Sequence, residues 1–69
     1  MLEIVESRLI IEDDCYAIGE GSLIDDFPDN WTDEMVDEHL QQYDGKTVYI
    51  INGITVVSEF GIYLGTYYI

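Results

Sequence analysis

The sequence predicts one α+β domain over residues 1–69, an antiparallel sheet of four to five strands in the order β-β-α-β-β-β with one amphipathic helix packed on a face. Three observations predict this class. β-rich segments stand near both ends of the chain, a central segment has helical periodicity, and Asn52-Gly53 interrupts an apolar run as a hairpin turn does. Because 69 residues are too few for two hydrophobic cores, we expect a single domain.

Two strands are predicted before the helix. Residues 2–11 are rich in aliphatic and β-branched side chains, and the acidic residues 12–14 that follow favour a turn. Residues 15–18 form a short partner strand, which ends where the glycines of residues 19–22 loosen the backbone. Residues 23–30 then read as an acidic connecting loop, because their proline biases the preceding residue away from helix.

One helix is predicted at residues 31–43. Asn30 or Thr32 would cap its N-terminus, acidic residues in its first turn complement the positive end of the dipole, and Gly45 is placed to end it. An apolar stripe at helical spacing would pack on the sheet, and it comprises Met35, Val36, His39, Leu40 and Tyr43.

The segment after Lys46 is predicted to be a β-meander. A two-residue turn at Asn52-Gly53 would pair Ile51 with Ile54, and the next residues outward in the same register. Residues 58–61 are a second turn. Residues 62–69 form the returning strand, in which Gly65 permits a bulge or a close approach.

This register makes both faces of the hairpin apolar. One face would carry Tyr49, Ile51, Ile54 and Val56, and the other Val48, Ile50 and Val57. One helix covers only one of these faces. Either the N-terminal strands curl over the second face, or two chains meet there as a homodimer through the C-terminal sheet.

Charge is the most unusual property of the chain. Fifteen Asp and Glu against two Lys and Arg give a net charge of −13. Direct binding to nucleic acid or to an anionic membrane is therefore not expected, because both need basic residues. The carboxylates are also segregated, since Glu59 is the only one after Asp44. Self-repulsion on this scale destabilises a compact state, which favours a binding role over a mere aid to solubility.

The density of the predicted helix charges resembles that of a nucleic-acid backbone. Four carboxylates between Asp33 and Glu38 would give about one charge per 1.9 Å of axis at a rise of about 1.5 Å per residue, against about one per 1.7 Å in duplex DNA. The predicted partner-binding residues are Glu12, Asp13, Asp14, Asp25, Asp26, Asp29, Asp33, Glu34, Asp37 and Glu38. A generic acidic face for a basic protein partner is the alternative.

No enzyme activity, cofactor or specific metal site is predicted. The acidic residues 25–29 lack the alternating ligands and central glycine of an EF-hand. His39 on the apolar stripe is interpreted as a packed or boundary residue, and no motif provides Cys15 with a base and an oxyanion hole. Trp31 is interpreted as a core residue rather than an exposed anchor. A single cysteine, with no signal-peptide pattern and no long apolar run, favours the cytoplasm of a host cell.

In size, segregated acidity and its lone cysteine, the chain resembles in kind the small DNA-mimicking inhibitors of bacteriophages and mobile elements, the anti-CRISPR and anti-restriction proteins. The resemblance implies a stoichiometric inhibitor that occupies the basic nucleic-acid-binding surface of a host defence complex and blocks loading of DNA or RNA. No functional residue is carried over from those families.

Two other classes remain open at this point. An immunity protein or antitoxin would use the same acidic face against one basic toxin. An assembly module would use the two-faced apolar hairpin instead, with the acid as a solvated exterior, and its self-association would be insensitive to salt.

Overall fold

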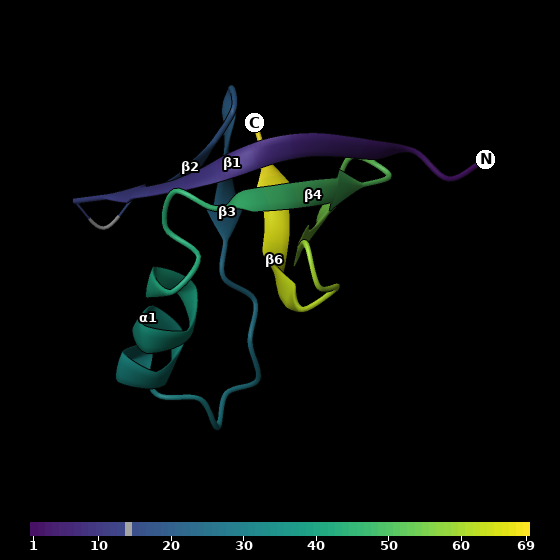
Figure 1. Cartoon of the computed structure of the whole chain (residues 1–69). Coiled ribbons are helices and arrows are strands. Elements are labelled where there is room, and N and C mark those ends of the chain that lie inside the picture. The colour runs from purple at the N-terminus through teal and green to yellow at the C-terminus, as the bar shows by residue number, and fades with distance from the viewer. Residues whose placement is uncertain (14) are drawn as a thin grey trace.

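The chain forms a closed antiparallel barrel of six strands with one helix beside it (Figure 1). This computed structural model describes residues 1–13 and 15–69. The elements are β1 (Ile4–Glu12), β2 (Cys15–Ile18), β3 (Gly21–Ile24), α1 (Asp33–Gln41), β4 (Thr47–Ile51), β5 (Thr55–Ser58) and β6 (Tyr63–Tyr68). Around the barrel the order is β1-β2-β3-β6-β5-β4, and β4 pairs with β1 to close it. The predicted α+β class, an open sheet of four to five strands in the order β-β-α-β-β-β, is therefore wrong.

The strand missing from the prediction is β3. Gly19, at φ 56°, and Glu20 form a tight turn, so the chain returns at once and pairs Ile18 with Gly21. Gly21 is needed for a close approach rather than for flexibility, because a Cβ there would lie 2.5 Å from the carbonyl oxygen of Tyr68. The neighbour of β3 on its other side is β6, which lies more than forty positions away in the sequence.

The C-terminal meander and its turns are confirmed, but the predicted hairpin register is wrong by one residue. Asn52 and Gly53 both have positive φ, and Ile51 lies opposite Thr55 instead of Ile54. Ile54 lies outside the β4–β5 ladder: its N–H donates to the Ile51 carbonyl at 3.2 Å within the turn, and its carbonyl accepts from the Tyr67 N–H of β6 at 2.6 Å. A one-residue slip exchanges the faces of a strand, so it changes which β5 side chains lie inside.

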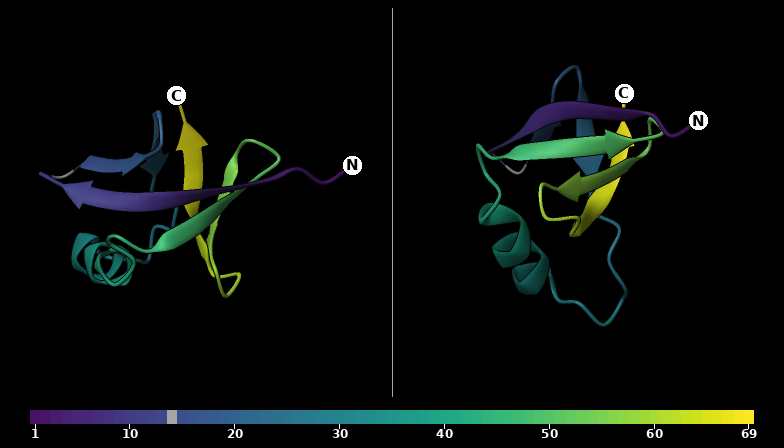
Figure 2. Two further views of the ribbon diagram at one scale, coloured as in Figure 1. Left: turned by 45° about the horizontal axis from the view of Figure 1, so that its top comes forward. Right: turned by 45° about the vertical axis from the view of Figure 1, so that its right-hand side comes forward.

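The barrel interior follows from this register. Along β4 and β5 the buried side chains are Val48, Ile50, Val56 and Ser58, whereas Tyr49, Ile51 and Val57 face outward and are half-buried. Strands β1 to β3 form the opposite wall of the closed barrel (Figure 2). The N-terminal strands therefore curl over the inner face of the β4–β5 hairpin, which was one of the two arrangements expected from its apolar faces. The buried core comprises Leu9, Ile18, Leu23, Val36, Leu40, Val48, Ile50, Val56 and Leu64.

Gly65 marks the bulge that its position in β6 predicts. Val56 lies opposite Gly65 and Val57 opposite Tyr63, which leaves Leu64 as the extra residue. A Cβ at Gly65 would overlap the carbonyl oxygen of Ile24 and lie 2.7 Å from Leu23 Cδ1. Both predicted reasons for this glycine, a bulge and a close approach, are confirmed.

The helix is shorter than predicted, nine residues instead of thirteen, and it does not pack on a sheet face with its whole stripe. Thr32 is the N-cap, and its Oγ1 accepts from the Met35 N–H at 3.1 Å. Only Val36 and Leu40 enter the core; Met35 is 46% exposed. The barrel already encloses most of its own core, so the helix contributes one narrow seam.

Candidate functional site

Every predicted partner-binding residue that the structure describes is exposed. Glu12 ends β1 and Asp13 follows in the turn, at φ 46°. Asp14 lies outside the described residues. The remaining residues belong to the β3–α1 connection and to α1. Together they form what we call the acidic surface: Glu12, Asp13, Asp25, Asp26, Asp29, Asp33, Glu34, Asp37 and Glu38.

The fold places the three acidic segments on one side of the molecule. In Figures 1 and 2 the end of β1 lies close to the C-terminal end of α1, and the β3–α1 connection leads into the N-terminal end of α1. Hydrogen bonds fasten the first of these junctions. The Gly45 N–H donates to the Leu9 carbonyl at 2.6 Å, and the Ile11 N–H donates to Asp44 Oδ1 at 2.9 Å. The N-terminus and the β4–β5 turn point to the other side (Figure 1).

On α1 the acidic side chains occupy one continuous face. At 3.6 residues per turn, the positions 33, 34, 37 and 38 span an arc of about 140° around the helix axis. The core residues Val36 and Leu40 lie outside that arc. Within the described residues, one side-chain hydrogen bond involves these carboxylates, from Gln41 Nε2 to Asp37 Oδ1 at 3.4 Å.

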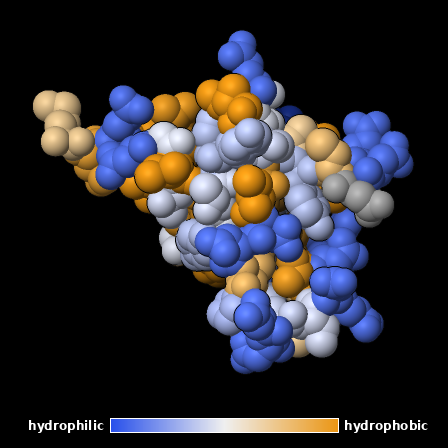
Figure 3. Space-filling model, turned by 180° about the vertical axis from the view of Figure 1, so that it is seen from behind, coloured by the Kyte–Doolittle hydropathy of each residue, from blue (hydrophilic) through white to orange (hydrophobic). Residues whose placement is uncertain are grey.

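The two cationic residues of the chain lie beside the junction of β1 with the end of α1, where the Leu9 N–H donates to the Lys46 carbonyl at 3.1 Å. Arg8 is on β1 opposite Thr47, and Lys46 directly precedes β4, so both lie at the β1–β4 junction. Neither lies on α1 or on the β3–α1 connection. Seen from behind, hydrophilic residues lie along the right and lower edges of the molecule and also at its top and upper left, with apolar residues between them (Figure 3).

Sequence reasoning missed an aromatic cluster beside this surface. Phe27 stacks on Trp31 with ring centroids 4.5 Å apart and planes 10° apart. The His39 ring lies edge-on to Phe27 at 5.3 Å, to Trp31 at 5.4 Å and to Tyr43 at 5.7 Å. The spacing of Trp31, Met35, His39 and Tyr43, four residues apart, is the sequence signal for this second helix face.

His39 and Trp31 both lie at the boundary of the core. Trp31 is half-buried and packs against the core cluster. His39 Nε2 is buried and has no hydrogen-bond partner among the described residues. The imidazole is therefore held by ring contacts rather than by a polar network. Cys15 is exposed at the start of β2, outside any disulfide.

Two hollows flank the helix. One of about 510 Å³ lies between the end of α1 and the β5–β6 turn, and its wall includes Tyr43, Lys46, Glu59 and Phe60. The other, of about 370 Å³, is lined by Trp31, Met35, Glu38, His39 and Gln42. Among residues 1–13 and 15–69, no three His, Cys, Asp or Glu side chains converge as a metal site would require.

No protein family, curated protein or solved structure matches this chain. Across the described residues, no helix has the length and apolar character that crossing a membrane requires.

Proposed function

We propose that this protein is a stoichiometric inhibitor that binds the basic nucleic-acid-binding surface of a host defence complex and blocks loading of DNA or RNA. The observation that carries the proposal is that Glu12 and Asp13, at the end of β1, lie on the same side of the barrel as the acidic residues of the β3–α1 connection and α1 (Figure 1). The partner-binding set is the acidic surface together with Asp14.

The mechanism is competition. Exposed carboxylates take the place of phosphates against Lys and Arg of the partner, and the net charge of −13 speeds the encounter by long-range attraction. Because dissolved ions screen the attraction between carboxylates and Lys or Arg, the affinity falls as the salt concentration rises. The protein transfers no group and needs no cofactor for this role.

The proposal is tested by capture from a bacterial lysate with the tagged protein, elution in a salt gradient, and an assay of each captured protein for nucleic-acid binding. We expect a basic complex that salt releases and that loses its nucleic acid when the inhibitor is present. Capture of one small toxin would replace the proposal by an antitoxin role. Self-capture alone, insensitive to salt, would replace it by an assembly role through the C-terminal sheet.

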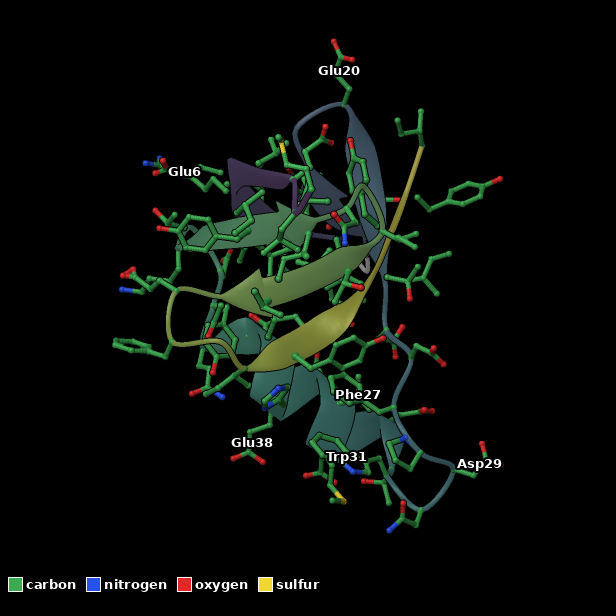
Figure 4. All side chains as sticks on the ribbon, turned by 90° about the vertical axis from the view of Figure 1, so that its right-hand side faces the viewer. Glu6, Glu20, Phe27, Asp29, Trp31 and Glu38 are labelled. Carbon is green, nitrogen blue, oxygen red and sulfur yellow. The ribbon has the colours of Figure 1, made fainter. Side chains whose placement is uncertain are left out.

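A matched pair of variants connects the capture to the acidic surface. Asp33→Lys, Asp37→Lys and Glu38→Lys together change the net charge from −13 to −7, because each replacement adds two positive charges. Glu3→Lys, Glu6→Lys and Glu20→Lys make the same change at exposed positions; Glu6 and Glu20 lie away from the helix (Figure 4), and Glu3 directly precedes β1. We expect the first triple variant to lose the partner and the second to keep it.

A further inference from the structure

We propose that the hollow lined by Trp31, Met35, Glu38 and Gln42, which we call the Trp31 hollow, receives an arginine side chain of the partner. This inference rests on the proposed function and deepens it, because it names the group that the acidic surface positions. It depends on the aromatic cluster and the shape of the helix face, which the proposed function does not use.

The helix and the residues that flank it build the hollow. Met35 and Glu38 lie about 60° apart around the axis of α1 at 3.6 residues per turn, Gln42 is the C-cap, and Trp31 comes from the segment before the N-cap Thr32. The face of Met35 and Glu38 is distinct from the seam of Val36 and Leu40, which are buried in the core. Met35, at 46% exposed, is not needed to fill the core and leaves its thioether at the surface.

Trp31 is held in place before the helix begins. Its backbone N–H donates to the Pro28 carbonyl at 2.9 Å, and the Phe27 ring stacks on the indole with ring centroids 4.5 Å apart. His39 packs against it edge-on, so the indole cannot rotate into the hollow without losing two ring contacts. Figure 4 shows Phe27 and Trp31 together beside the helix, with Glu38 further along the helix. A fixed aromatic wall is a preorganised one, which lowers the entropy cost of binding.

The residues that line the hollow favour a guanidinium group over an ammonium group. Trp is the best aromatic partner for a cation, and a planar guanidinium also stacks on it, which a compact ammonium does not. Glu38 is exposed at the rim, where its carboxylate accepts two parallel N–H bonds. Gln42 Nε2 donates to the His39 carbonyl at 3.0 Å, which leaves Gln42 Oε1 as the amide's acceptor.

Size and charge agree with this occupant. The hollow, of about 370 Å³, is shallow and open to solvent, so a side chain can enter it from the surface. Glu38 is the one carboxylate in its lining, which also includes His39, and Asp37 and Glu34 lie on the adjoining helix face. The larger hollow has Lys46 and Glu59 in its wall, so it favours neither sign of charge. The Trp31 hollow is therefore where a basic partner would insert a side chain.

The test compares two peptides of equal charge, hexa-arginine amide and hexa-lysine amide, labelled for fluorescence polarisation. Trp31 is the only tryptophan, so its emission reports occupancy of the hollow directly. We expect the arginine peptide to bind about five-fold more tightly and to change Trp31 emission, since stacking on an aromatic face adds to the charge attraction. The lysine peptide should bind without that emission change.

Two variants and one control locate the effect. Glu38→Gln should weaken binding of the arginine peptide about five-fold, and Met35→Lys, at an exposed position, should abolish the preference for arginine. Glu20→Gln removes the same charge from the β2–β3 turn, far from the hollow (Figure 4), and should change binding by less than about 1.5-fold because exposed charges are screened.

Three results would overturn the inference: equal affinity for both peptides, unchanged Trp31 emission on arginine-peptide binding, or equal effects of Glu38→Gln and Glu20→Gln. If both peptides bind equally but a basic complex is still captured, only the inference about the Trp31 hollow is rejected, and the proposed function stands. Loss of the basic complex from the capture experiment removes the proposed function, whatever the peptides do.

Discussion

Ser58 is the one buried polar residue that the described core contains, at 2% exposed. Its Oγ accepts from the Phe60 N–H at 3.2 Å and from the Ile62 N–H at 3.1 Å. The Ser58 N–H in turn donates to the Ile62 carbonyl at 2.9 Å. One hydroxyl thus satisfies two backbone donors of the β5–β6 turn. The position looked like an ordinary turn residue in the sequence, because its burial depends on the register of β5.

Ser58→Ala should lower the free energy of unfolding by about 2 kcal/mol, since it leaves two partly buried N–H groups without an acceptor. Urea unfolding monitored by Trp31 fluorescence measures this loss. Ser22→Ala, at a half-buried strand position, is the control and should change stability by less than about 0.5 kcal/mol. A similar small change for both variants would show that the turn does not depend on the hydroxyl.

Gly65 and Gly53 are needed for different reasons, because a Cβ would collide with β3 at Gly65 but meets nothing at Gly53. Gly65→Ala should destabilise by about 3 kcal/mol, because its Cβ would overlap backbone and side-chain atoms of β3 that cannot move independently. Gly53 also has positive φ, but a Cβ there meets nothing within 4 Å. Gly53→Ala should therefore lose only about 1 kcal/mol, from the left-handed backbone. Thermal unfolding compares the two, and equal losses would contradict the close β3–β6 approach.

Among the elements, the helix depends most on its surroundings. Nine residues are too few for a stable isolated helix in water. Asp33 and Glu34 complement its N-terminal dipole, whereas Asp37 and Glu38 oppose the C-terminal end. Its anchors are Val36 and Leu40 in the core. The acidic surface is thus carried by an element that the barrel must hold in place.

Thr32→Ala should lower the free energy of unfolding by about 1 kcal/mol, because the Met35 N–H loses its cap acceptor. Thr32→Ser keeps the hydroxyl and should stay within about 0.3 kcal/mol of the wild type. Far-ultraviolet circular dichroism and urea unfolding together measure both. An unchanged stability for the alanine variant would mean that the cap contributes nothing to the fold.

Local patterns predicted most elements but not their assembly. The strand before residue 12, the helix, its Thr32 cap and the Asn52-Gly53 turn each depend on neighbours in the sequence, and they are present. The strand β3 was missed because its pairing with β6 depends on contacts more than forty residues apart. The hairpin register was missed because the loop between Ile51 and Thr55 holds three residues, whereas Asn52-Gly53 favours a loop of two.

At the scale of the molecule, closure of the barrel could not be predicted from the sequence pattern, because it also depends on contacts between residues far apart in the sequence. Alternation along β4 marks one inner face, but it does not say whether the opposite wall is a helix or three more strands. The acidic set could be predicted, because exposure follows from charge. Its gathering on one side could not, since that depends on where the β1–β2 turn and the β3–α1 connection lie relative to α1.

The net charge of −13 should make stability depend on salt. Raising NaCl from about 20 mM to about 500 mM shortens the screening length several-fold and relieves repulsion among the carboxylates, so the thermal midpoint should rise by several degrees. The variant with Asp33, Asp37 and Glu38 changed to Lys should show a smaller rise. A midpoint that does not move with NaCl would contradict strong self-repulsion in the folded state.

The central claim is that the acidic surface takes the place of a nucleic acid on a basic partner. The most direct measurement is a titration of the captured complex, loaded with fluorescently labelled nucleic acid, with the wild-type protein. We predict that the wild-type protein displaces the nucleic acid fully near one equivalent, and that salt weakens this displacement. The variant with Glu3, Glu6 and Glu20 changed to Lys should still displace the nucleic acid. The variant with Asp33, Asp37 and Glu38 changed to Lys should not. Two results would contradict the claim: equal displacement by the two triple variants, or no displacement by the wild-type protein.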